Sequence, residues 1–339
     1  MAYRILHIAD VHLDMAFAGA GAALGKRRRE ELREAFERAL ALAKERGVNA
    51  LCIAGDLYED YRAGNDRAAY LRRVLGDLAP MRVFISPGNH DPHTSTSIYE
   101  RIAGDLDNVV VFGRRRFAKA ALAEGITLWG FGHERDLDRD PALAGFSCEG
   151  PGTHLLLFHG SDRDRVPPGK ESVAPFSAAE IESAGADHAM VGHFHGLMQG
   201  RRYAYPGSLE PHTFAQDGRH TASLVSIEDG RVSAEFIDAN RVRYVELALD
   251  VEPFADRAAL GQAAAERVAA STAGDDVVYC RIRLAGAAQD SLEFDAAALE
   301  AELDERFPGT RVVDDSASID YDAVAREGRT VRAEFVRAM

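Results

Sequence analysis

The chain has 339 residues, of which 46% are hydrophobic, and its 54 acidic and 40 basic side chains give a formal net charge of −14. This composition excludes a disordered chain and argues against a surface that attracts nucleic acid everywhere, although it leaves room for a confined basic track. No apolar run approaches the roughly 20 residues that span a bilayer, and Asp10 would interrupt a signal peptide. We therefore expect a soluble, cytoplasmic protein with no membrane partner. The length and composition predict two domains, and a change of pattern at about Arg241 places them at residues 1–240 and 241–339.

The first predicted strand, Tyr3–Ala9, ends at two polar residues, Asp10 and His12. Side chains two residues apart in an extended chain point the same way, so this carboxylate and this imidazole are predicted to converge. The alternative is that Asp10 only ends the strand and that His12 is an incidental loop residue. An amphipathic helix, Lys26–Arg46, follows and is predicted to pack on the sheet, with Gly47 ending it.

A second predicted strand, Asn49–Ala54, is apolar throughout, which is typical of a parallel sheet covered on both faces. It ends at Gly55 and Asp56, so a second carboxylate follows a strand end. The helix predicted at Asp66–Leu78 precedes a third strand. This order of strand, helix and strand implies right-handed crossovers in a parallel sheet.

The third strand ends abruptly in the stretch VFISPGNHD, Val83–Asp91. Ligand and catalytic groups of open α/β sheets gather at this carboxyl edge. Asn89 offers a neutral oxygen ligand, His90 an imidazole that can carry a proton near neutral pH, and Asp91 a carboxylate able to orient that imidazole. Taken alone, the stretch is equally consistent with a plain turn built from Pro, Gly, Asn and Asp.

Further strands are predicted along the chain, and two of them end in histidines. The strand Thr153–Phe158 runs into His159, and Asp187–Val191 is followed by His193 and His195, again two residues apart. The stretch between these strands is predicted to be a long surface loop. The other strands of this first part are predicted at Asn108–Phe112, Phe117–Leu122 and Ile126–Gly132, and a hairpin at Thr221–Asp238.

From about Arg241 the pattern changes, because none of the predicted elements ends in a histidine. We expect a small α+β domain that recognises something rather than doing chemistry. Its predicted strands and helices are Arg243–Asp250, Asp256–Ala270, Val277–Leu284, Ala296–Phe307 and Thr310–Asp314, and Tyr321–Met339 is predicted to be helical in part.

The groups at the strand ends form a set of oxygen and imidazole donors without thiolates, which suits Mn²⁺, Fe²⁺ or Zn²⁺. Their number exceeds what one ion needs, so we predict two divalent ions that share the Asp56 carboxylate and promote in-line attack of water on phosphorus. His90 stands beside the set, where it can stabilise or protonate the leaving oxygen. The predicted ligands are Asp10, His12, Asp56, Asn89, His159, His193 and His195.

The order D-x-H, G-D, G-N-H-D, H-G and G-H-x-H resembles that of the calcineurin-like metallophosphoesterases. Within that superfamily, the blocks HIADVHLD, GDLYE, GHFH and YPGSLE look like those of the SbcD-type DNA repair exonucleases, especially the YhaO-like branch. The resemblance implies an α/β fold, a metallophosphoesterase β-sandwich flanked by helices, with a smaller C-terminal α+β capping domain. It implies that His90 is the catalytic histidine outside the metal shell, and that the ligand sets are Asp10, His12, Asp56 and His195 for one metal and Asp56, Asn89, His159 and His193 for the other.

The function expected from this resemblance is a Mn²⁺-dependent exonuclease or endonuclease that cuts phosphodiester bonds at DNA ends during repair. The alternative, which the net charge favours, is a small-molecule phosphodiesterase or phosphatase, for example one acting on cyclic nucleotides. A third hypothesis, an inactive scaffold, is opposed by the full ligand set. The resemblance also implies a second domain that helps to place DNA, a homodimer formed through nuclease-domain helices, and a coiled-coil ABC-type ATPase partner of the SbcC kind.

Two positions depart from the relatives, and two arginine clusters are candidates for DNA contact. Asp14 stands where the nearest SbcD relatives have Gly, and Glu59 stands where the superfamily often has Asp. The first cluster consists of Arg114, Arg115 and Arg116, and the second of Arg201 and Arg202. Each cluster either borders the site or lies on a solvated loop. The histidines outside the motifs are predicted to be structural or exposed, namely His93, His133, His154, His188, His212 and His220.

Overall fold

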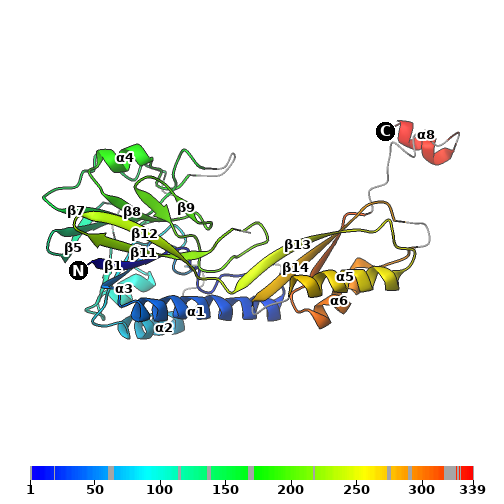
Figure 1. The fold of residues 1–339 in the computed structure, drawn as a ribbon, viewed down its shortest axis with the longest axis horizontal. Helices are drawn as coiled ribbons and strands as arrows, with labels where there is room; N and C mark the ends of the chain where they lie inside the picture. Colours follow the sequence, from blue (N-terminus) through cyan, green and yellow to red (C-terminus); the bar gives the residue numbers. More distant parts are fainter. Residues whose placement is uncertain are drawn as a thin grey trace. The chain divides into compact units, whose positions relative to one another are not determined.

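Two six-stranded sheets pack face to face in the computed structural model (Figure 1). The first sheet has the order β12-β11-β1-β2-β3-β4, with β1 at Tyr3–Ile8, β2 at Ala50–Ile53, β3 at Arg82–Ile85, β4 at Val109–Val111, β11 at Thr221–Glu228 and β12 at Arg231–Asp238. The second sheet has the order β5-β6-β7-β8-β10-β9, with β5 at Ala118–Ala123, β6 at Ile126–Gly130, β7 at Thr153–His159, β8 at His188–Gly192, β9 at Met198–Gln199 and β10 at Tyr203–Tyr205.

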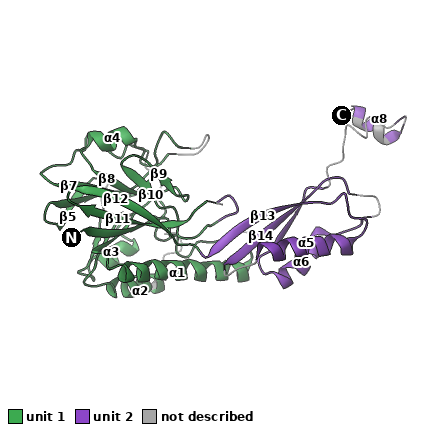
Figure 2. Ribbon diagram, in the orientation of Figure 1, with its two compact units in different colours: residues 1–212, 218–240 green, residues 213–217, 241–339 purple. Residues whose placement is uncertain are grey.

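The chain divides into two units (Figure 2). Unit 1 comprises Met1–His212 and Gly218–Asn240, and unit 2 comprises Thr213–Asp217 and Arg241–Met339. The structure describes residues 2–18, 20–59, 65–113, 116–135, 139–166, 172–216, 218–272, 276–288, 292–316, 326, 328 and 330–338. Within these residues, no helix is long and apolar enough to cross a membrane.

The central strands of each sheet run parallel, so their carboxyl ends gather at one edge. β1, β2, β3 and β4 pair in parallel, as do β6, β7, β8 and β10. Antiparallel strands lie outside them, with β11 and β12 beside β1, β5 beside β6, and β9 beside β10. The backbone N–H of His193, just after β8, donates to Asp10 at 3.0 Å, so the carboxyl ends of the two sheets lie side by side.

Three helices cover the outer face of the first sheet: α1 at Ala22–Glu45, α2 at Asn65–Gly76 and α3 at Ile98–Ala103. In α1 the buried residues Leu32, Phe36 and Ala43 recur at helical spacing and pack on the sheet. The chain leaves α1 through Gly47, whose φ of 57° lies in the left-handed region that glycine adopts without strain. These helices support the strands whose ends carry the candidate ligands.

The outer face of the second sheet is covered by α4, at Ala178–Ser183, and by the segment that leads into it. α4 begins with a capping box, in which Ser177 and Glu180 each accept the other's backbone N–H. The ring of Phe176 packs edge-on against Phe158 of β7 at 5.0 Å between centroids. The predicted surface loop after β7 is therefore anchored at its described carboxyl end.

The core between the sheets holds two buried histidines, His7 of β1 and His188 of β8. His7 lies on the same inward face of β1 as Ile5 and Ala9. Burial, aided by His188, lowers the pKa of His7 to about 3, and burial lowers the pKa of His188 to about 4. Both rings are therefore neutral in the folded protein, whereas the unfolded chain takes up protons on its histidines below about pH 6.5.

Acid is expected to destabilise the fold through these two rings. Because the unfolded state binds more protons below about pH 6.5, each ring should remove about 2 kcal/mol of unfolding free energy between about pH 7.5 and about pH 5. Urea unfolding at both pH values should show that His188→Gln loses about 2 kcal/mol less than the wild type over this interval. Equal losses in the two proteins would mean that His188 is not held neutral in the folded state.

Unit 2 contains a parallel three-stranded sheet in the order β13-β14-β15, at Val242–Asp250, Val277–Ala285 and Arg311–Asp314. The connecting helices are α5 at Arg257–Ser271 and α6 at Ala296–Arg306, and they share a hydrophobic core with the sheet. Asp256 and Asp295 cap these helices by accepting backbone N–H groups of the first turn. A further helix, α8, spans Val331–Ala338.

The helix-flanked β-sandwich predicted from the sequence is confirmed, and a smaller unit of helices and strands follows it. Four short elements escape the sequence pattern, namely α3, α4, β9 and β10. The strands β9 and β10 have two and three residues, and α3 and α4 have six each. Such lengths are too short for hydrophobic periodicity to reveal.

Candidate metal centre

The candidate ligands lie at the carboxyl edge of the sheets, in the loops after β1, β2, β3 and β8 and, for His159, at the last residue of β7. The first two loops pair with each other, because the backbone N–H of Asp10 donates to Gly55 at 3.1 Å and that of His12 to Asp56 at 2.9 Å. Asp10, His12 and Asp56 have φ values of 52°, 48° and 51°, in the left-handed region. The extended backbone predicted for Asp10 and His12 is therefore wrong, and strained turns bring both residues to the centre.

Asp56 lies in the middle of the centre. Its Oδ2 atom is 3.3 Å from Nε2 of His159 on one side and 3.6 Å from Nε2 of His12 on the other. Burial opposes ionisation of this carboxyl, but the imidazoles of His159 and His12 hold the pKa of Asp56 well below its usual range. Asp56 is thus an ionised carboxylate that faces two groups of donors.

The first group of donors surrounds His12. Nε2 of His12 lies 3.2 Å from Nε2 of His195, which in turn lies 3.8 Å from Oδ1 of the buried Asp10. Burial, aided by His12, lowers the pKa of His195 well below its usual range. The ring of His195 is therefore neutral, which is the form that binds metal ions.

The second group of donors surrounds the buried His159. Its Nε2 lies 3.1 Å from Oδ1 of Asn89, and its ring centroid lies 5.2 Å from that of His193. Nδ1 of His159 donates to the carbonyl of Ala54 at 2.9 Å, which fixes the tautomer in which Nε2 can bind a metal. Burial lowers the pKa of His193 to about 3, so this ring is neutral as well.

These donors fit two divalent metal ions. Ligand atoms on one ion, with bonds of about 2.1 Å, lie roughly 3.0–3.4 Å apart at ordinary bond angles. The separations of 3.1, 3.2 and 3.3 Å within the two groups match this spacing. The structure thus brings the seven predicted ligands together, with Asp56 between the groups.

Two glycines let the loops approach the ligands closely. A Cβ on Gly88 would lie 2.2 Å from Oδ1 of Asp56, and a Cβ on Gly55 would lie 2.4 Å from Nδ1 of His159. Gly55 also has a φ of 86°. A side chain at either position would displace a ligand, which explains the glycines of the G-D and G-N-H-D blocks.

His90 stands beside the centre with 47% of its side chain exposed. Its Nδ1 lies 3.2 Å from Oε2 of Glu59, whose Oε1 lies 2.8 Å from Nδ1 of His12. The hydrogen bond to Glu59 raises the pKa of His90 to about 9. The positive charge of a nearby divalent ion would lower this pKa toward about 7. An exposed ring that holds a proton beside buried ligands suits a residue that meets the substrate.

Asp91 does not orient His90, contrary to the prediction. Its buried carboxylate accepts hydrogen bonds of 2.5–3.1 Å from four donors, the backbone N–H groups of Asp56, Leu57 and Gly88 and the hydroxyl of Tyr99. The carboxylate that orients His90 is Glu59, from the loop after β2. Asp91 instead joins the loop after β2 to the loop after β3.

Sequence reasoning missed the contact of Glu59 with His90 and the position of His212 beside the centre. The signal for Glu59 is its place in the GDLYE block, three residues after Asp56. His212, predicted to be structural or exposed, is 3% exposed and packs edge-on against His12 and His195, with ring centroids 5.0 and 4.9 Å away. His212 lies in the loop after β10, outside the motif blocks, so no motif marks it.

Arg116 lies at the same edge as the metal centre. It precedes β5, whose first residue, Ala118, pairs with Gly130 at the carboxyl end of β6. The other two arginines of this predicted cluster, Arg114 and Arg115, lie outside the described residues.

Arg201 and Arg202 lie at the opposite, amino edge, which favours the alternative of a loop away from the site over a position bordering it. They precede β10, which pairs in parallel with β8 starting at Ala189, near the amino end of that strand. Their guanidinium groups lie 3.3 and 3.8 Å from the carboxylate of Glu182. Both arginines are therefore neighbours of an acid and remote from Asp56.

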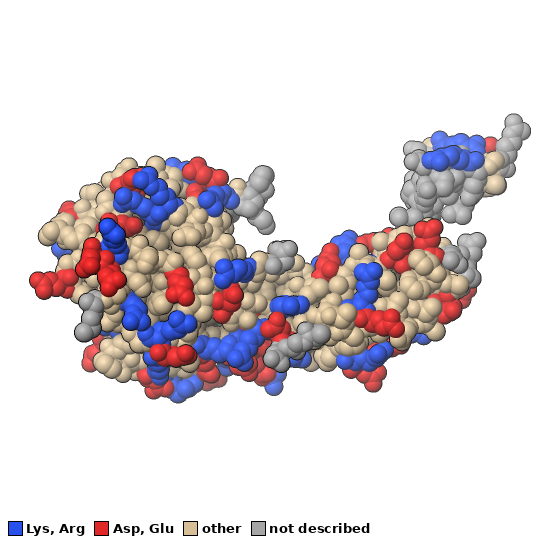
Figure 3. All heavy atoms as spheres, in the orientation of Figure 1, with Lys and Arg blue, Asp and Glu red and all other residues tan. Residues whose placement is uncertain are grey.

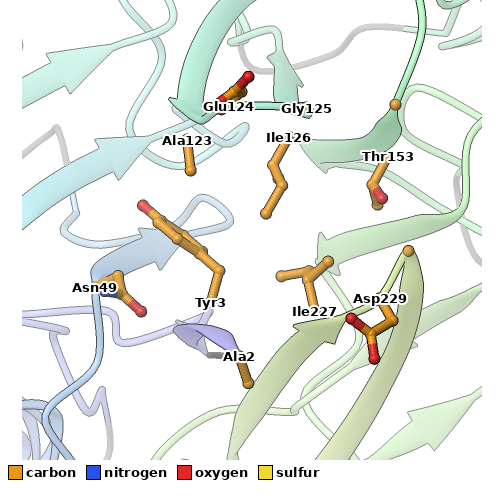
Figure 4. Close-up of a pocket in the computed structure, with 12 residues that line it drawn as sticks. Ala2, Tyr3, Asn49, Ala123, Glu124, Gly125, Ile126, Thr153, Ile227 and Asp229 are labelled. Carbon is orange, nitrogen blue, oxygen red and sulfur yellow. The ribbon is translucent and has the colours of Figure 1, made fainter.

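A cavity of about 510 Å³ also opens at the amino edge (Figure 4). Its lining includes Tyr3, Ile126 and Thr153, the first residues of β1, β6 and β7. Among the described residues that line it, the charged ones are Glu124 and Asp229, and none is a histidine. The cavity is therefore separate from the metal centre.

A β-sandwich that gathers two groups of metal donors around one carboxylate, beside an exposed histidine, has the groups that a metal-dependent phosphoesterase needs. The model of the calcineurin-like phosphoesterase family matches residues 3–197, and the chain belongs to this family. It is a hydrolase of phosphoesters, and its family uses divalent metal ions.

Two relatives extend the comparison. The chain is 24% identical over 308 residues to the uncharacterized metallophosphoesterase YhaO of Bacillus subtilis, and the alignment covers 85% of this chain and 72% of YhaO. It is 26% identical over 235 residues to the DNA double-strand break repair protein Mre11 of Methanopyrus kandleri, covering 63% of this chain and 50% of that protein. The chain thus spans about half the length of this second relative.

Solved structures also align with this chain. The protein TT1561 of Thermus thermophilus aligns with a TM-score of 0.44 at 15% identity, over 70% of this chain and 99% of that chain. A dimetal phosphatase from Danio rerio aligns with a TM-score of 0.37 at 12% identity and with the same coverage.

Proposed function

We propose that this phosphoesterase is a nuclease that hydrolyses phosphodiester bonds at DNA ends. The observation that carries the proposal is the pair of donor groups around Asp56, with the exposed His90 beside them. A relative named for DNA double-strand break repair aligns over 235 residues, which supports DNA as the substrate. Unit 2 also supports it, because a polymer needs a second surface for placement and a small phosphoester does not.

In the proposed reaction the chain holds the reacting groups in place. Two divalent ions, when bound, would neutralise the phosphoryl oxygens and lower the pKa of the attacking water. Asp56 and the imidazoles on either side of it hold these ions, and Glu59 fixes the ring of His90 through Nδ1. Nε2 of His90 is then left to give its proton to the leaving oxygen of the DNA strand.

The charge of the protein requires that DNA be held by a few local contacts. Acidic and basic side chains are intermixed on the face drawn in Figure 3, and the formal net charge is −14. A confined track of arginines at the edge of the centre would therefore carry the binding. Arg116 is exposed and lies at that edge.

Arg116→Ala is expected to weaken DNA binding and to flatten its salt dependence by about one unit of log–log slope, since each phosphate contact releases about one counterion. Turnover of a small artificial phosphodiester should stay unchanged, because that substrate reaches the metals without the track. The matched control is Arg201→Ala at the amino edge, which should leave the slope unaltered. An unaltered slope in Arg116→Ala as well would dismiss Arg116 as a DNA contact.

Substrate comparison tests the nuclease proposal directly. The metal-loaded protein should cleave linear double-stranded DNA faster than closed circular DNA, and should hydrolyse cyclic nucleotides poorly. Efficient hydrolysis of cyclic nucleotides without cleavage of linear DNA would instead favour a small-molecule phosphodiesterase, the function that the acidic net charge supports.

We further propose that the nuclease acts as a homodimer with a coiled-coil ABC-type ATPase. The support for both partners is the resemblance to SbcD-type exonucleases. The proposed dimer contact uses the exposed sides of α1 and α2, where ion pairs such as Lys26 with Glu30 lie in solvent. Light scattering of the purified chain tests the homodimer. A mass equal to that of a single chain would contradict it.

A further inference from the structure

The imidazole of His212 lies against the first group of donors, although it belongs to no motif. It meets the rings of His12 and His195 at interplanar angles of 82° and 76°. One nitrogen of each ring lies within 4.8 Å of the other two. Two ligands on opposite sides of one ion lie about 4.2 Å apart, so a small movement of these side chains would place all three nitrogens on one ion.

The loop that carries His212 is fixed from the side of α1. Arg28, which is 1% exposed, donates to the carbonyl of Pro211 at 2.7 Å. Arg38 donates to the carboxylate of Glu210, also 1% exposed, at 2.6 Å. Charged groups are costly to bury unless they are paired, so these contacts hold the backbone just before His212 in one position. The ring of His212 is therefore held in a fixed position beside His12 and His195.

We propose that His212 is a further ligand of the metal ion held by Asp10, His12, Asp56 and His195. The inference deepens the proposed function and rests on its two-metal site. Three imidazoles would make this ion site richer in nitrogen than the site around His159. Imidazole suits Zn²⁺ and Fe²⁺, whereas carboxylate and water suit Mg²⁺ and Mn²⁺, so the His212 site should prefer the first pair of ions.

Cobalt binding tests this role without any measurement of turnover. Metal-free protein titrated with Co²⁺ should bind two ions, and in His212→Ala the affinity of one of them should fall by roughly 10–100-fold. The visible absorption of that ion should change, because a nitrogen donor is exchanged for water, and added imidazole should restore it. Competition with Zn²⁺ and Mn²⁺ should show a weaker preference for Zn²⁺ in the variant.

The matched control is His154→Gln, a buried histidine at the amino end of β7 whose ring accepts from Trp129. It should keep both affinities and the spectrum of the wild type. If His212→Ala does not fold, His212→Asn, which keeps a polar side chain, takes its place.

Three outcomes separate the inference from the proposed function. Unchanged affinity and spectrum in the His212 variant would show that His212 only packs against the centre, which overturns the inference. A wild type that binds a single Co²⁺ ion would overturn the two-metal site itself. If two ions bind as expected but the protein does not cut DNA, the nuclease proposal is wrong and the role of His212 still stands.

Discussion

Asp56→Asn is expected to abolish phosphodiester hydrolysis and to release at least one of the two metal ions. Oδ2 of Asp56 lies 3.3 Å from Nε2 of His159 and 3.6 Å from Nε2 of His12, so this carboxylate faces both donor groups. An amide of the same shape removes the negative charge that holds two cations together. Groups that act as a unit typically cost on the order of 10³-fold or more in turnover when one is lost.

Metal analysis of purified Asp56→Asn, alongside turnover of an artificial phosphodiester, measures both effects. Asp162→Asn is a matched control, because Asp162 is 2% exposed, as Asp56 is, and its carboxylate accepts from the hydroxyl of Tyr203. This control should retain two ions per chain. Two tightly bound ions and normal turnover in Asp56→Asn would remove Asp56 from the bridging role.

His90→Ala is expected to lower turnover by roughly 10²–10⁴-fold while both metal ions stay bound. The side chain contacts Glu59, whereas the contact of residue 90 with Asp56 is made by its backbone N–H at 2.9 Å. The substitution keeps that backbone bond, so the bridging carboxylate should hold its position.

The leaving group provides the sharpest readout for His90. A phosphodiester with a nitrophenolate leaving group needs little protonation, so its hydrolysis should suffer far less in His90→Ala than the cleavage of DNA, whose alkoxide leaving group needs a proton. Equal losses on both substrates would argue against proton donation. Loss of metal together with activity would mean that His90 is itself a ligand.

The sandwich and its ligand loops were predictable, because strand order and hydrophobic pattern are local properties of the sequence. An apolar strand such as β2 signals a parallel sheet, and a polar residue after it, such as Asp56, must then lie at the carboxyl edge. The assembly of seven ligands follows from that rule applied to five strands.

The partners of each ligand were not predictable, because they are set by contacts between distant loops. Asp91 follows His90 in sequence, yet it bonds the backbone of residues 34 and 35 positions away, and Glu59 reaches His90 from 31 positions away. His12 and His195 meet across 183 positions. Periodicity over a few residues carries no information on such pairs.

Asp14 has a backbone conformation that is unusual for its residue type. Its φ of 64° lies in the left-handed region, which favours glycine. The carboxylate compensates by pairing with Arg33 of α1 at 2.8 Å and with Arg67 of α2 at 2.6 Å. The ion pairs of Asp14 thus link α1 to α2 and offset the strain of its backbone conformation.

The four hydrogen bonds on Asp91 are made entirely by groups of the protein, so they join the loops after β2 and β3 without using a metal ion. The conformational entropy of the loops after β2 and β3 is therefore lost when the protein folds, and not when the metal binds. A small metal-dependent domain such as a zinc finger, in contrast, folds only when its ion binds. We therefore expect removal of the metal ions to stop hydrolysis while the loops after β2 and β3 keep their shape.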